Sequence, residues 1–290
     1  MIYDCFIFFN ELELLELRLH ELAGVVDKFV LVEATRTHSN QPKPLHFSEN
    51  RERFADFADQ IIHVVVDDAP PTDKYFFIER FQRNAIARGL RDCRPDDWVL
   101  VSDVDEIPKA ATVARVSRAE PFSTSWPARA AHGAFNSRLT QTLFRWKGWR
   151  RLRRNHHPFI LKFEQSFHCY YLNCVSVQPR YWYGTRMLRF RDFTSAEEVR
   201  HSGRRVVRDG GWHFTFMGGA ERIRGKIQAY SHTEFNQPQF TQAAAIDERI
   251  NRGDSLFGDD AQMEIISVDD SFPRYLVEHP ERFPGWIKPV

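Results

Sequence analysis

The sequence predicts an α/β protein, with a Rossmann-like, mostly parallel sheet flanked by helices and then a mixed α+β half in the same compact domain. In the first hundred residues, buried aromatic and β-branched runs alternate with helical segments, as parallel sheets covered on both faces require. From about residue 128 the chain changes to Thr-, Phe-, Tyr- and Trp-rich stretches broken by Gly and Asn, which are typical of antiparallel strands. We therefore expect an α/β half over residues 1–118 and a mixed half over residues 119–290.

The first half contains four apolar runs that predict buried strands, at residues 2–9, 28–32, 61–66 and 98–102. Each run ends at polar or acidic residues. These are Asn10 and Glu11, Glu33, Asp67 and Asp68, and Asp103 to Glu106. Ligands of open α/β sheets bind beyond the carboxyl ends of the strands, so we expect a binding site among these residues.

Helices are predicted between the strands from the spacing of apolar residues. Four leucines at helical spacing predict a helix over residues 11–23, which Asn10 would cap and Gly24 would end. The tail from Phe272 is rich in proline and is expected to be irregular. Further helices are predicted at residues 49–57, 75–90, 108–116, 221–230 and 242–251, and a further strand at 212–217.

Composition narrows the class of protein. The chain is 42% hydrophobic and 27% charged with a net charge of +1, which indicates a globular protein and gives no global signal for nucleic acid. Its four cysteines are scattered, so we expect a reducing compartment. The first residues do not resemble a signal peptide, and no apolar run approaches 18 residues. We therefore expect a cytoplasmic protein whose contact with a membrane, if it makes one, is peripheral.

The fourth predicted strand delivers three carboxylates to its end, on Asp103, Asp105 and Glu106. Residues i and i+2 of an extended chain point the same way, and close carboxylates repel one another unless a cation lies between them. Oxygen ligands suit Mg²⁺ or Mn²⁺, which could in turn bind a diphosphate. A solvated acidic turn is the simpler interpretation of the same residues.

Phosphatases of the haloacid type also carry Asp-x-Asp after a strand. That strand normally lies near the start of the domain, and a Thr or Val follows four residues after the first Asp. Here Ile107 holds that place and three strands come first. The phosphatase interpretation therefore ranks below one in which the carboxylates hold a metal and a nucleotide-sugar.

Several motifs follow one another along the chain. They are Phe9-Asn10-Glu11-Leu12-Glu13-Leu14-Leu15-Glu16-Leu17-Arg18-Leu19, Val32-Glu33-Ala34 with Thr37-His38, Lys43-Pro44-Leu45, Ser102-Asp103-Val104-Asp105-Glu106-Ile107-Pro108 and Gly211-Trp212-His213. In this order they resemble glycosyltransferase family 17, over roughly residues 3–235. The resemblance implies a GT-A fold, a nucleotide-sugar donor such as UDP-GlcNAc, Mn²⁺ or Mg²⁺, inversion at the anomeric carbon, and a glycan or glycolipid acceptor.

The resemblance also implies roles for single residues. Asp105 would bind the metal directly, Asp103 would reach the ribose or a metal-bound water, and Glu106 would lie behind the metal or face the acceptor. His213 would complete the metal shell, or would be a hydrogen-bonded histidine beside Trp212.

Further residues are expected to contact the donor. For Asn10 helix capping is the alternative, for Arg83 an intrahelical pair with Glu79, and for Lys226 a solvated position. The expected donor-binding residues are Asn10, Glu11, Glu33, Arg83, Asn84, Asp103 and Lys226.

An inverting transferase needs a carboxylate base for the acceptor hydroxyl, on the sugar face away from the diphosphate. Asp103 and Asp105 are thereby excluded. The candidates are Glu221, Glu234 and Asp192, with Glu221 first because it begins a predicted helix after a glycine turn. A carboxylate that only complements the helix dipole is the alternative for Glu221.

Residues 145–154 hold six basic residues and two tryptophans. This stretch alone suggests a different class, a module that binds polyanions or nucleic acid. The near-neutral charge of the whole chain instead favours a basic rim for an anionic acceptor or membrane head groups, so we expect no nucleic-acid partner. A solvated edge without function remains open.

Overall fold

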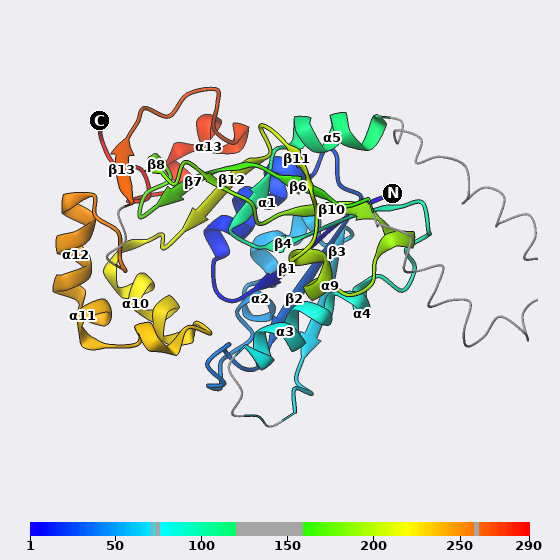
Figure 1. Cartoon of the computed structure of the whole chain (residues 1–290), viewed down its shortest axis with the longest axis horizontal. Coiled ribbons are helices and arrows are strands. Elements are labelled where there is room, and N and C mark those ends of the chain that lie inside the picture. The colour runs from blue at the N-terminus through cyan, green and yellow to red at the C-terminus, as the bar shows by residue number, and fades with distance from the viewer. Residues whose placement is uncertain (71, 73–75, 120–158, 258–260) are drawn as a thin grey trace, which may run out of the picture.

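The protein is described from a computed structural model, in which residues 1–70, 72, 76–119, 159–257 and 261–290 are placed (Figure 1). The described residues form a mixed α/β fold with two mixed sheets. The α/β fold class is therefore confirmed. Strands from both predicted halves of the chain join the first sheet.

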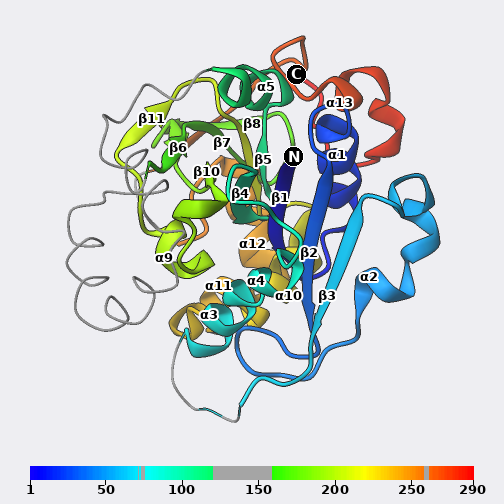
Figure 2. The same cartoon turned by 90° about the vertical axis from the view of Figure 1, so that its right-hand side faces the viewer.

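The first sheet has the order β11-β6-β10-β4-β1-β2-β3. Its strands β4, β1, β2 and β3 pair in parallel, and Figure 2 shows β1, β2 and β3 side by side. The four predicted strands are confirmed to within two residues. They are β1 (Ile2–Phe8), β2 (Lys28–Ala34), β3 (Ile61–Val66) and β4 (Trp98–Asp103).

The other three strands make this sheet mixed. β10 (Arg186–Arg189) runs antiparallel to β4, β6 (Leu161–Phe163) runs antiparallel to β10, and β11 (Arg205–Val207) is parallel to β6. The prediction of a mostly parallel sheet thus holds for the first four strands, and the later half of the chain extends the sheet with mixed pairing.

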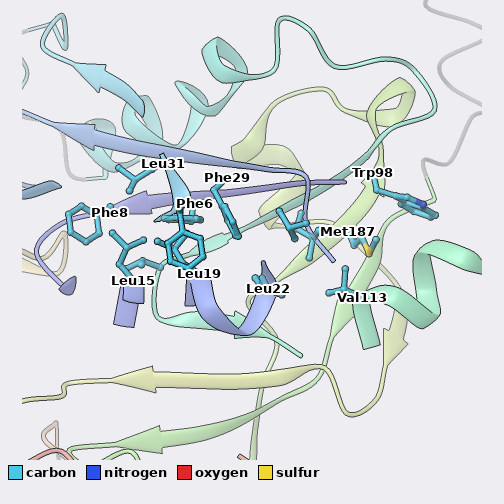
Figure 3. Close-up of a cluster of buried hydrophobic side chains, with 14 of the residues drawn as sticks. Phe6, Phe8, Leu15, Leu19, Leu22, Phe29, Leu31, Trp98, Val113 and Met187 are labelled. Carbon is cyan, nitrogen blue, oxygen red and sulfur yellow. The ribbon is translucent and has the colours of Figure 1, made fainter. Parts of the chain in front are cut away.

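Helices cover both faces of the first sheet. One face packs on α1 (Leu12–Leu22), α2 (His46–Glu49), the 3₁₀ helix η1 (Arg51–Phe57) and α5 (Ala110–Arg118), through the apolar cluster of Figure 3. The opposite face packs on α3 (Phe77–Asn84), α4 (Ile86–Gly89) and α9 (Ala196–Arg200). Alternate residues of each strand contribute to the two clusters, which is why the strands read as continuous apolar runs.

Three details of the predicted helices are corrected. Glu11, not Asn10, holds the N-cap position of α1, and it makes no side-chain cap hydrogen bond. The segment predicted as one helix at 49–57 is a short α2 followed by 3₁₀ helix, with non-helical angles at Phe54. The helix predicted at 75–90 is divided into α3 and α4 at Ala85.

A second sheet has the order β13-β8-β7-β12-β5, with β9 paired to β7. Its strand β5 follows β4 after only two residues. Residues 103–106, called the acidic turn below, therefore connect the two sheets. Gly211 in β12 has φ +122°, and a Cβ there would lie 2.2 Å from the carbonyl oxygen of Ile107, so only glycine fits beside β5. The strands are β5 (Glu106–Pro108), β7 (Gln165–Cys169), β8 (Cys174–Gln178), β9 (Tyr181–Trp182), β12 (Gly211–Thr215) and β13 (Gln262–Ile265).

Helix α1 lies between the two sheets. Leu15, Leu19 and Leu22 face the first sheet, whereas Leu14 and Leu17 pack with side chains of β5, β12 and the C-terminal tail. The tail was predicted to be irregular, but it contains two short helices, and side chains of the first of them, Arg274–Glu278, pack in this cluster. The remaining helical segments are η2 (Phe190–Asp192), α10 (Gly219–Ala229), η3 (Thr233–Phe235), α11 (Pro238–Thr241), α12 (Ala243–Arg252), α13 (Arg274–Glu278) and η4 (Pro280–Arg282).

Two further observations concern the cysteines and the helices. No disulfide joins the four cysteines, all of which lie among the described residues and are buried. None of the helices in the described parts of the chain combines the length and the apolar character that spanning a membrane requires.

Candidate active site

A cavity of about 690 Å³ lies at the carboxyl ends of β1, β2 and β4. Its position agrees with the expectation for an open α/β sheet. Charged and aromatic side chains line it together. The charged ones include Glu11, Glu79, Arg83, Asp103, Asp105, Glu106, Glu197, Arg200 and Lys226, and the aromatic ones include Phe167, Tyr170, Trp182, Phe216, Tyr230 and Phe257.

Asp103, the last residue of β4, lies between two guanidinium groups. Its Oδ1 is 3.3 Å from Nη2 of Arg83, and its Oδ2 is 3.1 Å from Nη2 of Arg200. Burial raises the pKa of this carboxyl, but Arg200 and Arg83 outweigh burial and hold the pKa below its usual range. Asp103 is therefore an ionised carboxylate at neutral pH.

Asp105 faces a different pair of groups. Its Oδ2 is 2.6 Å from Nζ of Lys226, and its Oδ1 is 3.7 Å from Nε2 of His213. Burial raises the pKa of Asp105, whereas Lys226 and His213 lower it more strongly, so the pKa lies well below its usual range. Pairing of β5 with β12 brings His213 here, because His213 is the register partner of Glu106.

His213 is buried against aromatic rings. Its ring centroid lies 4.8 Å from that of Trp182 and 5.3 Å from that of Phe167. Among the described residues, its Nδ1 has no hydrogen-bond partner, and its Nε2 lies 3.7 Å from Oδ1 of Asp105. The choice between a metal ligand and a hydrogen-bonded histidine therefore stays a prediction.

Glu106 is 1% exposed and its carboxylate is fully engaged by protein groups. Arg200 contacts it in a bidentate pair at 2.5 and 2.6 Å. Nε1 of Trp182 donates to it at 2.5 Å, and the backbone N–H of Asp103 at 2.9 Å. The glycine at position 184 leaves room for this carboxylate, because a Cβ there would lie 1.8 Å from Oε1. Glu106 thus holds Arg200 and Trp182 beside the acidic turn.

Arg83 makes the intrahelical pair that was the alternative to donor contact, and it also lines the cavity. It pairs with Glu79 one helical turn earlier at 2.6 Å, and it also reaches Asp103 and Glu197, the latter at 2.8 Å. Burial lowers the pKa of Arg83, but Asp103 and Glu79 raise it beyond its usual range. The intrahelical pair is confirmed, and the guanidinium also lines the cavity.

Lys226, on α10, is an ion-pair partner of the acidic turn rather than a solvated residue. Besides Asp105 it contacts Oε1 of Glu11 at 3.5 Å. Burial lowers the pKa of Lys226, but Asp105 and Glu11 raise it above its usual value. Of the predicted donor-binding residues, Glu11, Arg83, Asp103 and Lys226 line the cavity.

The other predicted donor-binding residues do not line it. Asn10 is exposed at the start of α1. Glu33 is fully buried outside the cavity lining, where it accepts the N–H of Phe47 at 2.9 Å and contacts His63 at 3.1 Å. The side chain of Asn84 accepts the N–H of Glu197 at 3.1 Å, in the first turn of α9. The local structure therefore gives these three residues no contact with a ligand in the cavity.

The three candidate bases also lie outside the cavity lining. Glu221 is exposed on α10 and pairs with Arg224, and Glu234 is exposed and pairs with His232. Asp192 lies in η2, which follows β10 at the amino-terminal end of β4, opposite the acidic turn. Their positions give no support to a role as base.

The cavity residues that escaped the sequence analysis include Trp182, Glu197 and Arg200. Trp182 lies in a two-residue strand, and the other two lie in a five-residue helix whose only local signal is the Ser195 cap. Segments this short carry no periodicity. The basic stretch at residues 145–154 lies outside the described residues.

Asp105 and His213 have the chemistry to share a divalent cation. Two ligands about 2.1 Å from one octahedral ion lie about 3.0 Å apart, and Oδ1 and Nε2 are 3.7 Å apart. In the part of the chain that the structure describes, no three His, Cys, Asp or Glu side chains form an ion-binding group. An ion here would therefore take most of its ligands from water and a bound diphosphate, as Mg²⁺ commonly does.

The fold and the site define an α/β protein with a charged ligand cavity at the carboxyl edge of its sheet. Within that class, residues 1–125 match the model of glycosyltransferase family 17, which confirms the predicted resemblance over those residues. Between residue 126 and residue 235 the likeness stays a prediction.

The relatives found are named beta-1,4-mannosyl-glycoprotein 4-beta-N-acetylglucosaminyltransferase. The chain is 34% identical to the proteins from Homo sapiens and Rattus norvegicus and 33% identical to that from Mus musculus, each over 107 residues. The aligned part covers 34% of this chain and 20% of each relative. The chain thus matches about one fifth of the length of these relatives.

Proposed function

We propose that the protein is a metal-dependent, inverting N-acetylglucosaminyltransferase with a GT-A type fold, which transfers the sugar of UDP-GlcNAc to a hydroxyl of a glycan or glycolipid. The observation that carries the proposal is the acidic turn. Asp103 and Asp105 lie in the segment that matches the family, at the edge of a cavity of about 690 Å³. Aromatic side chains in the cavity wall can stack on the flat faces of sugars. Carboxylates can bind a metal ion, and the basic side chains beside them can bind the diphosphate.

In this proposal each charged group has a defined task. Asp105 and His213 would hold Mn²⁺ or Mg²⁺, and the bound ion would neutralise negative charge on the diphosphate. Lys226, Arg83 and Arg200 are positioned to stabilise the same charge, because all three line the cavity beside the acidic turn.

The acceptor hydroxyl still requires a base. Glu79 and Glu197 line the cavity outside the acidic turn, but both pair with Arg83, which this proposal places on the diphosphate. Neither therefore meets the requirement for a base on the opposite face of the sugar. We assign no carboxylate of the described residues to this role.

Isothermal titration with UDP, with and without MnCl₂, tests the proposal. We expect UDP binding that strengthens with Mn²⁺ and that loses this dependence in Asp105→Ala. Glu221→Ala is the matched control, because it removes an exposed carboxylate outside the cavity and should titrate like the wild type. Absence of Mn²⁺-dependent binding in the folded wild type would contradict the proposal. Release of phosphate from an aryl phosphate would favour the phosphatase alternative instead.

A further inference from the structure

Arg18 lies on α1 between the two sheets, and its side chain is completely buried. Its Nε and Nη2 donate to the two carboxylate oxygens of Asp4 at 2.7 and 2.6 Å. Nη2 also donates to the hydroxyl of Ser102 at 2.6 Å, and the guanidinium lies over the ring of Phe6. Burying a charge in this way is costly unless every donor is satisfied, and here a full set of acceptors is present.

The remaining nitrogen of Arg18 contacts the backbone of the acidic turn. Nη1 donates to three carbonyl oxygens, those of Asp103 at 2.9 Å, Val104 at 3.2 Å and Glu106 at 3.0 Å. The fourth carbonyl of the turn, that of Asp105, accepts the N–H of Phe214 at 2.8 Å. All four carbonyls from residue 103 to residue 106 are therefore held by hydrogen bonds.

These bonds have a geometric consequence for the carboxylates. A peptide unit is planar, so fixing a carbonyl direction also fixes the backbone from which the adjacent side chain projects. Arg18 engages the turn from its buried side, whereas the side chains of Asp103 and Asp105 line the cavity on the other side. The charge of Arg18 is balanced by Asp4, so its contribution to the turn is orientation.

We propose that Arg18, held by Asp4, is a positioning residue that sets the direction of the Asp103 and Asp105 carboxylates for the metal diphosphate. The proposal rests on the proposed function. Outer partners that orient metal ligands typically account for 10- to 100-fold in metal affinity. Lysine cannot replace Arg18, because a single ammonium cannot reach the Asp4 carboxylate and three carbonyls at once.

The test compares two Arg18 variants with a control on the same helix. Asp4→Leu combined with Arg18→Met removes the pair without leaving a buried charge alone, a change that folded proteins often accept. Arg18→Lys keeps the positive charge but loses the planar guanidinium and its five N–H donors. The control is Leu22→Ala, which opens the core at the C-terminal end of α1 and removes none of the hydrogen bonds to the carbonyls of the acidic turn. Each protein is titrated with UDP with and without MnCl₂, and its Tm is measured.

We expect Mn²⁺-dependent UDP affinity to fall about 100-fold in the paired variant and about 10-fold in Arg18→Lys, the ends of the range for such partners. UDP binding without Mn²⁺ should stay within twofold, and Leu22→Ala should lower Tm and keep both affinities. Wild-type affinity in a folded paired variant would overturn the inference. If that variant does not fold, Arg18→Lys decides by the same comparison. A wild type without Mn²⁺-dependent binding would instead overturn the proposed function.

Discussion

Replacing Glu106 with glutamine removes one buried charge and keeps the size of the side chain. The carboxylate of Glu106 receives the bidentate contact from Arg200 at 2.5 and 2.6 Å, the indole N–H of Trp182 and the N–H of Asp103. An amide offers one acceptor oxygen and turns its NH₂ group toward donors. The variant therefore loses the ion pair with Arg200. Its amide NH₂ group would also face N–H donors that the Glu106 carboxylate accepts in the wild type.

The expected cost follows from these contacts. Breaking a buried ion pair by removing one partner costs about 3–5 kcal/mol. Arg200 keeps a second partner in Asp103 at 3.1 Å, so we take the lower end of that range. For domains of 150–250 residues each kcal/mol corresponds to about 2–4 °C, and a loss of about 3 kcal/mol would lower Tm by roughly 6–12 °C.

Thermal and urea unfolding of four proteins would measure this: the wild type, Glu106→Gln, Arg200→Met and the double variant. We expect a coupling energy of at least about 1 kcal/mol between positions 106 and 200, as contacting residues show. Glu221→Gln serves as the control, since exposed pairs contribute about 1 kcal/mol or less. A Glu106→Gln protein as stable as the wild type would refute the reasoning.

Three further predictions concern stability and binding. Burial lowers the pKa of His168 to about 3, so below about pH 6.5 the unfolded state binds a proton that the folded state does not. Between pH 7.5 and pH 4.5 this lowers the free energy of unfolding by about 3 kcal/mol. Urea unfolding of His168→Gln should show a pH dependence smaller by that amount, and an unchanged dependence would speak against it. Gly184→Ala places a Cβ 1.8 Å from Oε1 of Glu106, and thermal unfolding should show that the free energy of unfolding falls by about 1–3 kcal/mol. Equal stability would show that the Glu106 side chain can move aside. Lys226→Met should weaken UDP binding with Mn²⁺ by about tenfold in titration, because hydrogen bonds to charged groups contribute about 1.5–3 kcal/mol. Unchanged affinity would show that Lys226 pairs with Asp105 and does not contact UDP.

The first four strands could be predicted because strands that are buried on both faces of a sheet consist of continuous runs of apolar residues. The acidic turn could be predicted for the same reason, since a strand end fixes which residues come next. Glu33 shows where this argument stops. It follows its strand as expected, but the backbone N–H of Phe47 and the ring of His63 satisfy its carboxylate away from the cavity.

The later part of the site could not be predicted from local patterns. Glu221 does lie in the first turn of α10, as its spacing indicated, yet helix periodicity does not say which face meets the cavity. On the same helix Lys226 faces the acidic turn and Glu221 faces solvent. Arg200 and Trp182 reach the turn only through tertiary contacts, on segments too short to leave a pattern.

The two residues between β4 and β5 connect both sheets, and this connection affects how the protein folds. Arg200 lies 94 residues after Glu106, its partner, and Lys226 lies 121 residues after Asp105. Contacts between such distant positions form slowly, because closing a long loop costs entropy before any contact compensates for it. Arg83 on α3 can reach Asp103 once the early strands pair, whereas Glu106 and Asp105 meet Arg200 and Lys226 only when α9 and α10 pack against the turn. Completion of this site is therefore coupled to the last long-range steps of folding.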